Sequence, residues 1–308
     1  MTFLITGGRG FLAGHLAAEL RRRRPGARVA RLDHVPGPGI ITCDLRDPAA
    51  AGRAVRRVSP AVIFHLAGTT LARPWDELWA TFANSTVNLL EAVRSLPRPE
   101  RVRVVTAGSS AEYGAAAGGL LTEDFPPRPL TLYGAMKLSQ SLTALSYRHA
   151  GLDVVVARIA NLVGPGMPEN LALGTFARQL ARIKRGSQPP LIKVGNLRSS
   201  RDLIDVRDAA RALAMLAERG VSGEIYNVSS GAAVSTGAML RRLMTVAGIR
   251  AQARGEASRR RRGEALHVAC SYRKLRRLTG WRPRLSLERT LRDTYDWALA
   301  RAAQPAGD

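Results

Sequence analysis

The sequence predicts an α/β fold in which helices cover both faces of a parallel sheet, followed by a smaller C-terminal α/β subdomain. Three observations support this prediction. Short, continuously apolar segments alternate with longer amphipathic segments through the first half of the chain, and a glycine-rich turn joins the first two. From about residue 164 the alternation gives way to loops rich in proline and glycine, with further helices. Buried parallel strands are continuously apolar because both of their faces are covered.

The elements follow in order along the chain. The expected strands are Phe3–Thr6, Val29–Asp33, Ile40–Cys43, Val62–His65, Val102–Ala107 and Val154–Ile159. The expected helices are Gly10–Arg23, Pro48–Val58, Trp75–Val93, Tyr133–His149, Thr175–Arg185 and Asp205–Arg219. A late strand, Glu224–Asn227, is expected to return to the sheet. It is followed by a helix capped by Ser235, a short helix that stops at Gly280 and a helix capped by Ser286.

These elements predict two domains. Residues 1–160 and about 203–230 are expected to form the larger one, and about 161–202 with 231–308 the smaller one. No apolar run reaches the length of a membrane span, and the N-terminus shows no signal-peptide pattern. The two cysteines, Cys43 and Cys270, form neither a disulfide framework nor a metal-binding pattern, which fits a reducing cytoplasm.

The chain is strongly basic. It has 47 Lys and Arg residues against 24 Asp and Glu residues, a formal net charge of +23. Such a charge favours anionic partners, and nucleic acid is one candidate. However, the arginine runs at 21–24 and 259–262 contain no interleaved aromatic residues, and only 5% of all residues are aromatic. We therefore expect a solvated basic surface, which is compatible with a small anionic substrate.

The segment FLITGGRGFLAGHL predicts a dinucleotide site. It places Gly7, Gly8 and Gly10 between a strand and a helix, where the backbone can approach a pyrophosphate and the helix N-terminus offers free N–H groups. The third position of the usual glycine spacing is Ala13, a mild departure because that position governs helix–strand packing. Asp33, at the end of the second strand, stands where an acid meets the adenosine ribose.

The same segment leaves the choice of cofactor open. A carboxylate at Asp33 favours NAD, because it would repel the 2′-phosphate of NADP. Arg9, Arg31 and His34 argue for NADP, since an arginine can pair with that phosphate. We expect NAD(H) or NADP(H), with NAD slightly favoured.

Tyr133 and Lys137 stand four residues apart on one face of a predicted helix. A phenol is a poor acid or base at neutral pH unless a nearby ammonium stabilises the phenolate. Ser109 and Ser110, at the end of the preceding strand, can supply a hydroxyl that hydrogen-bonds a substrate oxygen. This combination indicates proton transfer to or from an oxygen of the substrate.

These motifs together resemble the extended short-chain dehydrogenase/reductase family over nearly the whole chain. The resemblance lies in TGGRGFLAG, CDLRDP, VIFHLAG, GSSAEYG, YGAMK and RIANLVGPG. Within the family, the reductases of GDP-4-keto-6-deoxymannose are the most similar, through LTEDFPPRPLTLYGAMK, FARQLARIKRG, VGNLRSSRDLIDVRD and EIYNVSSG. The resemblance implies a Rossmann-type doubly wound sheet, with a nucleotide-sugar site in the smaller domain.

The resemblance also implies roles for individual residues. The implied catalytic residues are Ser109, Tyr133 and Lys137. The implied cofactor contacts are Gly7, Arg9, Gly10, Phe11, Leu12, Asp33, Asp44, Leu45, Leu66, Ala67, Gly68, Tyr133 and Lys137, with Asp44 and Leu45 beside adenine and Ala67 near the nicotinamide ribose. Asn161 and Arg201 are expected to contact the substrate, because an amide suits a sugar hydroxyl or base edge and an arginine fork suits a diphosphate. The resemblance adds Phe176, Gln179 and Asn196, and Ser110 offers a further hydroxyl. Arg158 also has a structural interpretation as a member of an internal salt bridge.

Two departures from the family pattern concern the substrate. Members usually read RPFNHIGPG where residues 158–166 here read RIANLVGPG, and Met167 replaces the glutamine that commonly follows. These residues line the nucleotide-sugar side, so the sugar and the base stay open.

Glu112 raises the question of dehydration. The related 4,6-dehydratases place a catalytic glutamate two residues before the tyrosine of this loop, and that position is Ala111 here. Glu112 is one residue nearer to Tyr113. In an extended loop, neighbouring side chains point to opposite sides, so we expect Glu112 to face away from the sugar.

The expected function is therefore reduction, with NAD(P)H, of the 4-keto group of a nucleotide-activated 4-keto-6-deoxyhexose, GDP-linked by default. A nucleotide-sugar epimerase with tightly bound NAD, a 4,6-dehydratase and a basic nucleic-acid-binding protein are the alternatives. The helices Trp75–Val93 and Tyr133–His149 would form a four-helix interface in a family homodimer.

Overall fold

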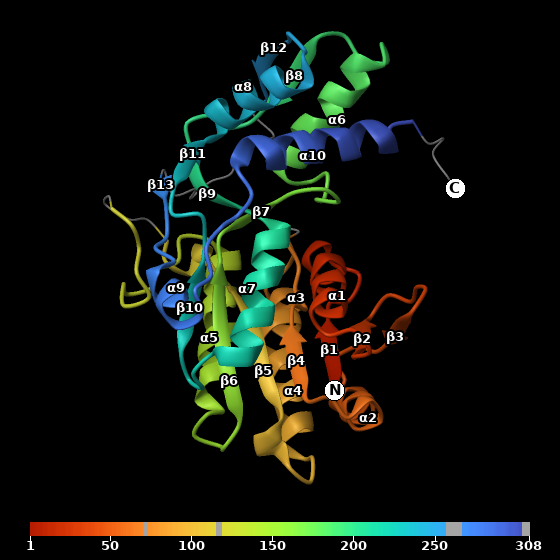
Figure 1. Cartoon of the computed structure of the whole chain (residues 1–308), viewed down its shortest axis with the longest axis vertical. Coiled ribbons are helices and arrows are strands. Elements are labelled where there is room, and N and C mark those ends of the chain that lie inside the picture. The colour runs from red at the N-terminus through yellow and green to blue at the C-terminus, as the bar shows by residue number, and fades with distance from the viewer. Residues whose placement is uncertain (71–72, 115–118, 257–266, 304–308) are drawn as a thin grey trace.

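Seven parallel strands form the sheet of the larger lobe in the computed structural model, which describes residues 1–70, 73–114, 119–256 and 267–303 (Figure 1). The strand order is β10-β6-β5-β4-β1-β2-β3, and each neighbouring pair is parallel. The strands are β1 (Thr2–Thr6), β2 (Arg28–Asp33), β3 (Ile40–Thr42), β4 (Val62–His65), β5 (Arg103–Ser109), β6 (Asp153–Ile159) and β10 (Ile225–Val228). The predicted strands are confirmed, including the late strand that returns to the sheet edge.

The strand order reverses beside β1. The chain adds β2 and β3 on one side of β1 and then crosses to build β4, β5 and β6 on the other. In such sheets, ligands bind outside the carboxyl ends of the strands at this reversal. The carboxyl ends of β1 and β4, at Thr6 and His65, therefore mark the expected position of a cofactor.

Helices cover both faces of this sheet (Figure 1). Helices α1 and α7 pack together over one face, and their apolar residues share a core with the strands. Helices α2, α4 and α5 cover the other face, where a second core forms. The bounds are α1 (Phe11–Arg23), α2 (Pro48–Val58), α4 (Ser85–Arg94), α5 (Leu132–Ser146), α7 (Val206–Arg219) and α9 (Arg273–Thr279), with short 3-10 turns η2 (Pro99–Arg101) and η3 (Ser110–Glu112).

One expected helix is divided. We expected a single helix over Trp75–Val93, but α3 (Trp75–Trp79) and α4 are separated by a π-helical turn, η1 (Ala80–Asn84). Phe82 lies in this turn, fully buried, with its ring edge-on to Tyr133 at a centroid distance of 5.9 Å. Single π-turns inside helices occur frequently at functional sites.

The smaller lobe contains two further sheets, which the sequence did not predict. One has the order β11-β9-β13 with β7 on β9, and the other pairs β8 with β12. These strands are short and carry charged or polar residues, so they lack the continuous apolar run of a buried strand. The strands are β7 (Asn161–Val163), β8 (Leu191–Val194), β9 (Ser200–Asp205), β11 (Ala233–Ser235), β12 (Gln252–Gly255) and β13 (His267–Val268), and the helices are α6 (Ala172–Lys184), α8 (Thr236–Ala247) and α10 (Leu287–Arg301). Ser235 and Ser286 cap α8 and α10, as predicted.

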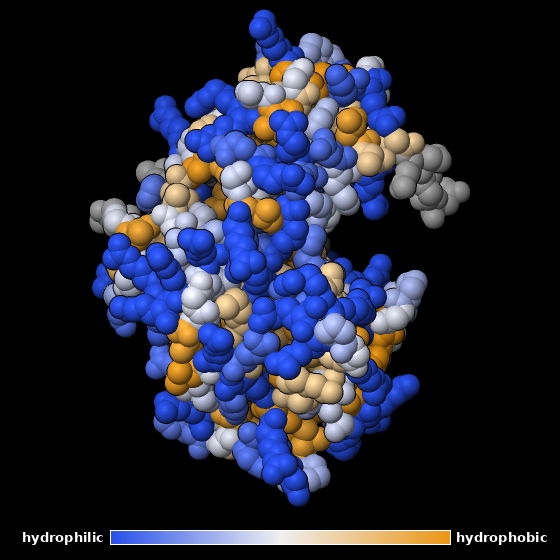
Figure 2. Space-filling model, viewed as in Figure 1, coloured by the Kyte–Doolittle hydropathy of each residue, from blue (hydrophilic) through white to orange (hydrophobic). Residues whose placement is uncertain are grey.

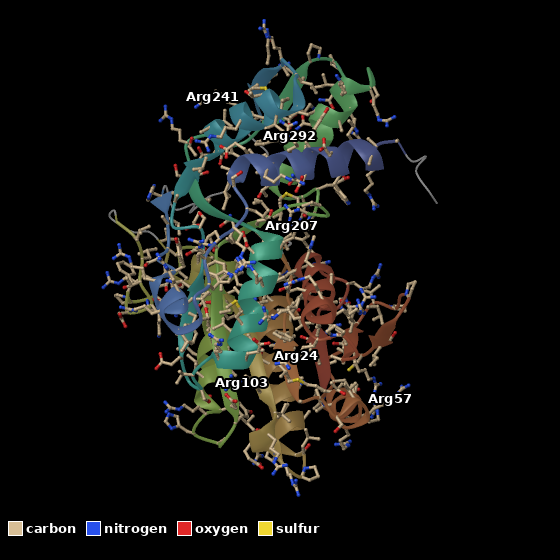
Figure 3. The ribbon with its side chains drawn as sticks, in the orientation of Figure 1. Arg24, Arg57, Arg103, Arg207, Arg241 and Arg292 are labelled. Atoms are coloured by element: carbon tan, nitrogen blue, oxygen red, sulfur yellow. The ribbon has the colours of Figure 1, made fainter. Side chains whose placement is uncertain are left out.

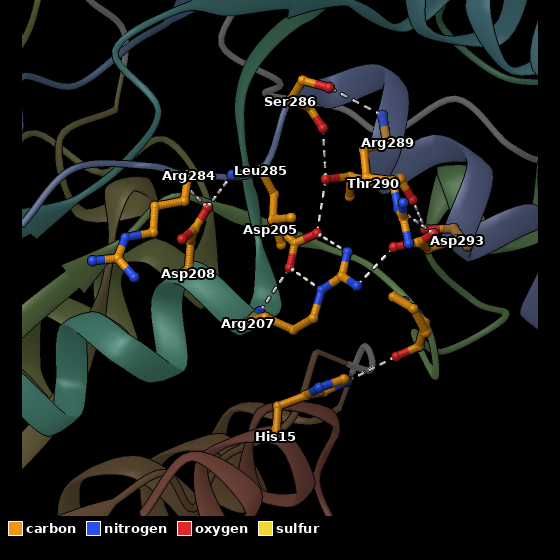
Figure 4. Close-up of polar contacts among 12 residues, drawn as sticks. His15, Asp205, Arg207, Asp208, Arg284, Leu285, Ser286, Arg289, Thr290 and Asp293 are labelled. Atoms are coloured by element: carbon orange, nitrogen blue, oxygen red, sulfur yellow. Dashed lines mark hydrogen bonds and ion pairs between the residues drawn. The ribbon is translucent and has the colours of Figure 1, made fainter. Parts of the chain in front are cut away.

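A polar cluster joins α7 of the larger lobe to α10 of the smaller lobe (Figure 4). Asp205 caps α7 by accepting the backbone N–H of Arg207 and also pairs with the Arg207 guanidinium at 2.7 Å. The same guanidinium reaches Asp293 of α10 at 2.7 Å, and the Thr290 hydroxyl donates to Asp205. These contacts fix the two lobes relative to each other.

The basic side chains are spread over the molecule. Arg24, Arg57 and Arg103 lie on the larger lobe, whereas Arg241 and Arg292 lie on the smaller one (Figure 3). Hydrophilic residues dominate the visible face, which is hollowed between the lobes (Figure 2). The Arg259–Arg262 run and the 304–308 tail lie outside the described residues. Among the helices that the structure describes, none is long and apolar enough to cross a membrane.

Candidate active site

The glycine turn between β1 and α1 is shaped by two close approaches of the backbone. Gly7 has a φ of 65°, and a Cβ on it would lie 2.9 Å from the Leu66 carbonyl oxygen after β4. A Cβ on Gly8 would lie 2.7 Å from the side chain of Arg31 on β2. Gly10 is the N-cap of α1 and provides no side-chain hydrogen bond, so the first N–H groups of the helix can meet an anion. The turn therefore fits a pyrophosphate.

The start of α1 also contacts the smaller lobe. Leu12 is buried, whereas the Phe11 ring is partly exposed and lies 3.8 Å from where a Cβ on Gly166 would stand. His15 Nε2 hydrogen-bonds the Pro165 carbonyl oxygen at 2.9 Å (Figure 4). The NLVGPG motif thus lies directly beside the glycine turn, which brings the predicted substrate and cofactor segments together.

The Asp33 carboxylate is largely satisfied by its own surroundings. Its Oδ2 accepts the backbone N–H of Arg9 at 3.0 Å, and its Oδ1 accepts that of Val35 at 3.1 Å. His34 Nδ1 lies 3.2 Å from the same Oδ1. Asp33 is only 9% exposed, so it organises the loops around the end of β2.

Two arginine side chains lie over the loop that follows Asp33. A Cβ on Gly37 would stand 3.5 Å from Arg9 Nε, and one on Gly39 would stand 3.5 Å from Arg31 Nη2. Arg31 also donates to the Pro38 carbonyl at 3.2 Å. Within the described residues, neither guanidinium forms an ion pair with a carboxylate. Two positive charges therefore remain available at the end of β2.

The predicted adenine contacts differ in exposure. Leu45 is buried, and its carbonyl accepts the Asn88 side-chain amide at 2.9 Å. Asp44 is 40% exposed and forms a 2.7 Å ion pair with Arg46. Hydrogen bonding to that guanidinium lowers the pKa of the Asp44 carboxyl. Asp44 is therefore an exposed carboxylate at this end of the site.

The segment after β4 lies between the glycine turn and the catalytic helix. The Ala67 backbone N–H donates to the Thr6 hydroxyl at 3.2 Å. A Cβ on Gly68 would stand 2.6 Å from the Phe82 ring, so glycine lets this segment approach η1 closely. Leu66, Ala67 and Gly68 thereby lie next to the groups that surround Tyr133.

The structure brings Ser109, Tyr133 and Lys137 together. Ser109 ends β5, while Tyr133 and Lys137 lie in the first turns of α5, which Thr131 caps. A Cβ on Gly134 would stand 2.5 Å from the Ala111 carbonyl oxygen, so the glycine allows α5 to touch the turn after Ser109. The two side chains are near enough for hydrogen bonding from Ser109 to lower the pKa of the Tyr133 phenol.

Burial shifts the pKa values of both titratable groups on α5. It raises the pKa of the Tyr133 phenol to about 12, although the hydrogen bond with Ser109 opposes the shift. It lowers the pKa of the Lys137 ammonium to about 8, while the Glu112 carboxylate opposes that shift. Tyr133 is therefore a neutral phenol at neutral pH, suited to donate a proton. Lys137 remains mostly charged.

Glu112 is turned away from the solvent-exposed side of the site. We expected an extended loop here, and that was wrong: residues 110–112 form the 3-10 turn η3. Glu112 is fully buried, and its Oε1 accepts the Ser109 N–H at 2.7 Å and the Ser141 hydroxyl at 3.0 Å. The carboxylate closes a capping box that fixes Ser109. Desolvation raises its pKa.

Arg158 neutralises this buried carboxylate. Its Nε lies 2.6 Å from Glu112 Oε2, and both side chains are almost wholly buried. The guanidinium also stacks 4.7 Å from the centre of the Tyr113 ring, whose hydroxyl donates to Asn227. The interpretation of Arg158 as a structural ion-pair partner is confirmed.

The predicted substrate residues fall into two groups. Asn161 is exposed on β7, and Arg201 is half-buried on β9 with a 3.0 Å hydrogen bond to the Ser200 carbonyl. The Asn196 side chain accepts the Arg198 N–H, and Ser110 is buried in η3. Asn161 and Arg201 lie on neighbouring elements, because β7 pairs with β9.

Phe176 and Gln179 face the interior of the smaller lobe. Phe176 is 3% exposed within its apolar core. The Gln179 amide hydrogen-bonds both the N–H and the carbonyl of Lys193, at 2.8 and 3.2 Å, and so joins α6 to β8. Phe176 is therefore packed and the Gln179 amide hydrogen-bonded by protein groups alone.

Two buried residues at the site were missed by the sequence reasoning. His65 at the end of β4 and Gln140 on α5 are both fully buried, and Gln140 Oε1 accepts a hydrogen bond from Lys137 Nζ at 2.9 Å. The signal for Gln140 was its position three residues after Lys137, which places both on one helix face. His65 stood in the quoted VIFHLAG motif, but its buried partners come from distant segments.

Comparison with known proteins agrees with this geometry. The sequence profile of the NAD dependent epimerase/dehydratase family matches residues 3–229. A GDP-6-deoxy-D-mannose reductase of Pseudomonas aeruginosa is 30% identical over 300 residues, covering 95% of this chain and 96% of the relative.

Two solved structures are also similar. The structure of RMD from Pseudomonas aeruginosa complexed with NADPH has a TM-score of 0.85 at 28% identity, over 97% of this chain and 99% of that chain. The UDP-glucose 4-epimerase of Thermus thermophilus in complex with NAD has a TM-score of 0.85 at 28% identity, over 99% of this chain and 100% of that chain.

Proposed function

The chain belongs to the NAD dependent epimerase/dehydratase family, and from this premise we propose that it reduces, with NAD(P)H, the 4-keto group of a nucleotide-activated 4-keto-6-deoxyhexose linked to GDP. It is an NAD(P)-dependent oxidoreductase of the extended short-chain dehydrogenase/reductase type. The observation that carries the substrate proposal is the pair of neighbouring hydroxyls of Ser109, at the end of β5, and Tyr133, on α5, in a chain similar to a reductase of a 6-deoxy sugar nucleotide.

The residues that would hold the cofactor fit its chemistry. The uncapped N-terminus of α1 and the glycine turn would bind the pyrophosphate, and Tyr133 and Lys137 would hold the nicotinamide ribose. When bound, the reduced nicotinamide supplies hydride to the carbonyl carbon. Tyr133 then donates its phenolic proton to the ketone oxygen, and the Ser109 hydroxyl hydrogen-bonds the same oxygen as negative charge develops. The Lys137 ammonium stabilises the phenolate that remains.

The acidic residue near the site does not suit dehydration. A dehydratase needs a carboxylate that can reach the sugar to remove a proton. Glu112 is buried with its oxygens bonded to Ser109, Ser141 and Arg158, and Ala111 occupies the adjacent position. These contacts support reduction over 4,6-dehydration.

The sequence slightly favoured NAD, but the surroundings of Asp33 lead us to propose the reverse, that NADPH is favoured over NADH. The Asp33 carboxylate accepts two backbone N–H groups, whose dipoles partly offset its repulsion of a 2′-phosphate. The guanidinium groups of Arg9 and Arg31 lie over the adjoining loop without a carboxylate partner among the described residues. Arginine pairs well with phosphate through charge-assisted hydrogen bonds.

The remaining proposals concern the substrate, the assembly and the compartment. Asn161 and Arg201 are proposed to contact the sugar and the diphosphate, because an amide suits a hydroxyl and an arginine fork suits a phosphate.

The exposed apolar residues of α3, α4 and α5 support a homodimer. Cys43 and Cys270 are both unpaired and buried, which supports a reducing, cytoplasmic location.

The test follows NADPH and NADH oxidation by absorbance with GDP-4-keto-6-deoxymannose and its dTDP counterpart. We expect consumption with the GDP sugar, and kcat/KM about tenfold higher with NADPH than with NADH. Tyr133→Phe should reduce kcat by at least about a hundredfold, because it removes the general acid. Leu120→Ala, an exposed residue on a loop, is the matched control and should retain full turnover.

Other results would contradict this function or favour one of the alternatives. Full turnover by Tyr133→Phe would disprove the proposed mechanism. NAD that survives purification, with sugar interconversion and no net cofactor oxidation, would identify an epimerase. Steeply salt-dependent nucleic-acid binding that persists in Tyr133→Phe would favour the binding-protein alternative.

A further inference from the structure

A continuous chain of buried polar side chains lies behind the proposed catalytic lysine. It runs from Thr6 on β1 through His65 on β4 and Thr86 on α4 to Gln140 and Lys137 on α5. The first four are fully buried, and Lys137 is 6% exposed. Such a chain in an apolar interior is stable only when each member is hydrogen-bonded.

The direction of each hydrogen bond follows from one fixed donor. The Thr86 hydroxyl donates to the Phe82 carbonyl at 2.6 Å, so its oxygen must accept the other two contacts. These are His65 Nε2 at 2.9 Å and Gln140 Nε2 at 3.2 Å. We therefore assign the His65 proton to Nε2 and turn the Gln140 amide nitrogen toward Thr86; that nitrogen also lies 3.2 Å from His65 Nε2, and in this assignment the two donors do not hydrogen-bond each other.

Both ends of the chain are then determined. Since His65 Nε2 carries the proton, Nδ1 accepts from the Thr6 hydroxyl at 2.8 Å, whose oxygen accepts the Ala67 N–H. Since the Gln140 nitrogen faces Thr86, its Oε1 faces Lys137 Nζ at 2.9 Å. The chain thus links the segment after β4 with the ammonium group on α5.

We propose that Gln140 is a positioning residue that holds the Lys137 ammonium in place and in its charged form. Lys137 Nζ has three N–H donors; one bonds the Ala107 carbonyl at 2.8 Å and one bonds Gln140. The third stays available for the cofactor ribose. The inference rests on the proposed function, in which the charged ammonium stabilises the Tyr133 phenolate.

The electrostatic surroundings make this support necessary. The Phe82 ring lies 5.0 Å from Lys137 Nζ, and burial lowers the pKa of the ammonium to about 8. Among the described residues, the titratable groups that face it are Glu112, whose carboxylate raises that pKa, His65, which burial keeps neutral, and Tyr133 one turn earlier on α5. Loss of one of the two acceptors should let the lysine lose its proton near neutral pH.

Two substitutions of Gln140 make opposite predictions. Gln140→Leu removes the acceptor, so the Lys137 pKa should fall by about one unit. The alkaline limb of the kcat–pH profile should then move to lower pH by the same amount. At about pH 8 the charged fraction of Lys137 then falls from about one half to about one tenth, so this variant should lose about fivefold in kcat. Gln140→Glu places a carboxylate at the same distance, so the same pKa and limb should move upward. Ser139→Ala, the preceding residue on α5, is the control and should change neither.

The Lys137 pKa can also be measured without a substrate. The chain has only four lysines, Lys137, Lys184, Lys193 and Lys274, so lysine labelled with 13C at Cε gives few NMR signals. Lys137→Arg assigns the signal of interest. Titration of the wild type and both Gln140 variants should show Lys137 shifts of opposite sign.

The two readouts separate the inference from the function. Opposite NMR shifts support the inference even if the wild type reduces neither sugar nucleotide, a result that would reject the proposed function alone. An unchanged Lys137 pKa in both variants would overturn the inference about Gln140. So would an equal loss of activity in both variants with no displacement of the pKa or the limb, because Gln140 would then serve only packing.

Discussion

His65 shows how burial sets a single protonation state. Its ring lies between β4 and the helices with no exposed surface, and it hydrogen-bonds Thr6 and Thr86. Desolvation, assisted by the Lys137 charge, lowers the pKa of the imidazole from 6.5 to about 3. The folded protein therefore keeps His65 neutral at a pH where the unfolded chain already binds a proton.

This difference predicts acid sensitivity. Because the folded pKa is depressed, the stability from neutral His65 is complete above about pH 6.5 and is lost as the pH falls toward about 3. The loss should approach about 1.4 kcal/mol for each pH unit. Urea denaturation at several pH values in this window should show that slope, reduced in His65→Gln. His149→Gln, at an exposed position, is the control and should keep the wild-type slope. Equal slopes in wild type and His65→Gln would contradict the assignment.

At the scale of elements, one acidic residue of α7 binds the backbone of the segment that leads into α10. Asp208 Oδ2 accepts the backbone N–H groups of Arg284 and Leu285, at 2.8 and 2.9 Å (Figure 4). Its Oδ1 pairs with Arg211 at 2.6 Å, and both of these side chains are buried. The carboxylate thus satisfies three donors from two segments.

Asp208→Ala should therefore be strongly destabilising. It leaves two backbone N–H groups and the Arg211 charge without an acceptor, which should reduce the free energy of unfolding by about 3–5 kcal/mol. Arg289→Ala is the comparison, because its ion pair with Asp293 is exposed on the arginine side. That change should reduce the free energy by less than about 1 kcal/mol. Urea denaturation measures both changes. Similar losses would show that the buried Asp208 contacts stabilise the fold no more than the exposed ion pair of Arg289.

The elements also show what the sequence could predict. The strands of the large sheet were predictable because both of their faces are covered, which leaves an apolar run such as VIFH. The strands β8 and β9 carry Lys193, Arg201 and Asp202, and their pairing depends on distant partners. The π-turn η1 was equally hidden, because its residues are those of an ordinary helix.

A similar limit applies within the site. Ser109, Tyr133 and Lys137 could be selected because their spacing is local to one strand end and one helix. Gln140 and His65 act through contacts between β4, α4 and α5, which no local pattern records. The role of Glu112 depended on the backbone shape of η3, and the assumption of an extended loop gave the wrong reason for its direction.

For the whole molecule, several of the many basic side chains form ion pairs within the fold. Arg23 at the end of α1 and the C-cap residue Arg24 both pair with Glu218 of α7, and Arg103 pairs with Asp153 across two strands. The arginines labelled in Figure 3 lie on both lobes rather than on one face. The labelled basic side chains are therefore not confined to one lobe.

An apolar surface does gather on the helices that cover one face of the sheet. Trp75 and Trp79 of α3 stack at 5.9 Å and are 53% and 41% exposed. Val87 of α4 and Leu142 of α5 are also exposed, at 37% and 54%, and these two helices pack side by side. Clustered exposed apolar residues are typical of a protein interface.

The proposed homodimer should bury this surface, so one charge within it should separate the subunits. Light scattering after size exclusion should give the wild type twice the mass of one chain, whereas Leu142→Glu should shift it to the monomer at low micromolar concentration. Unpaired burial of a carboxylate costs several kcal/mol, which weakens association at least about a hundredfold.

Val221→Glu is the matched control, because Val221 is similarly exposed, at 51%, but follows α7. A wild-type monomer would contradict the homodimer, and a dimer disrupted by Val221→Glu alone would place the interface elsewhere. Because α5 also carries Tyr133 and Lys137, the separated Leu142→Glu subunits should in addition show reduced kcat.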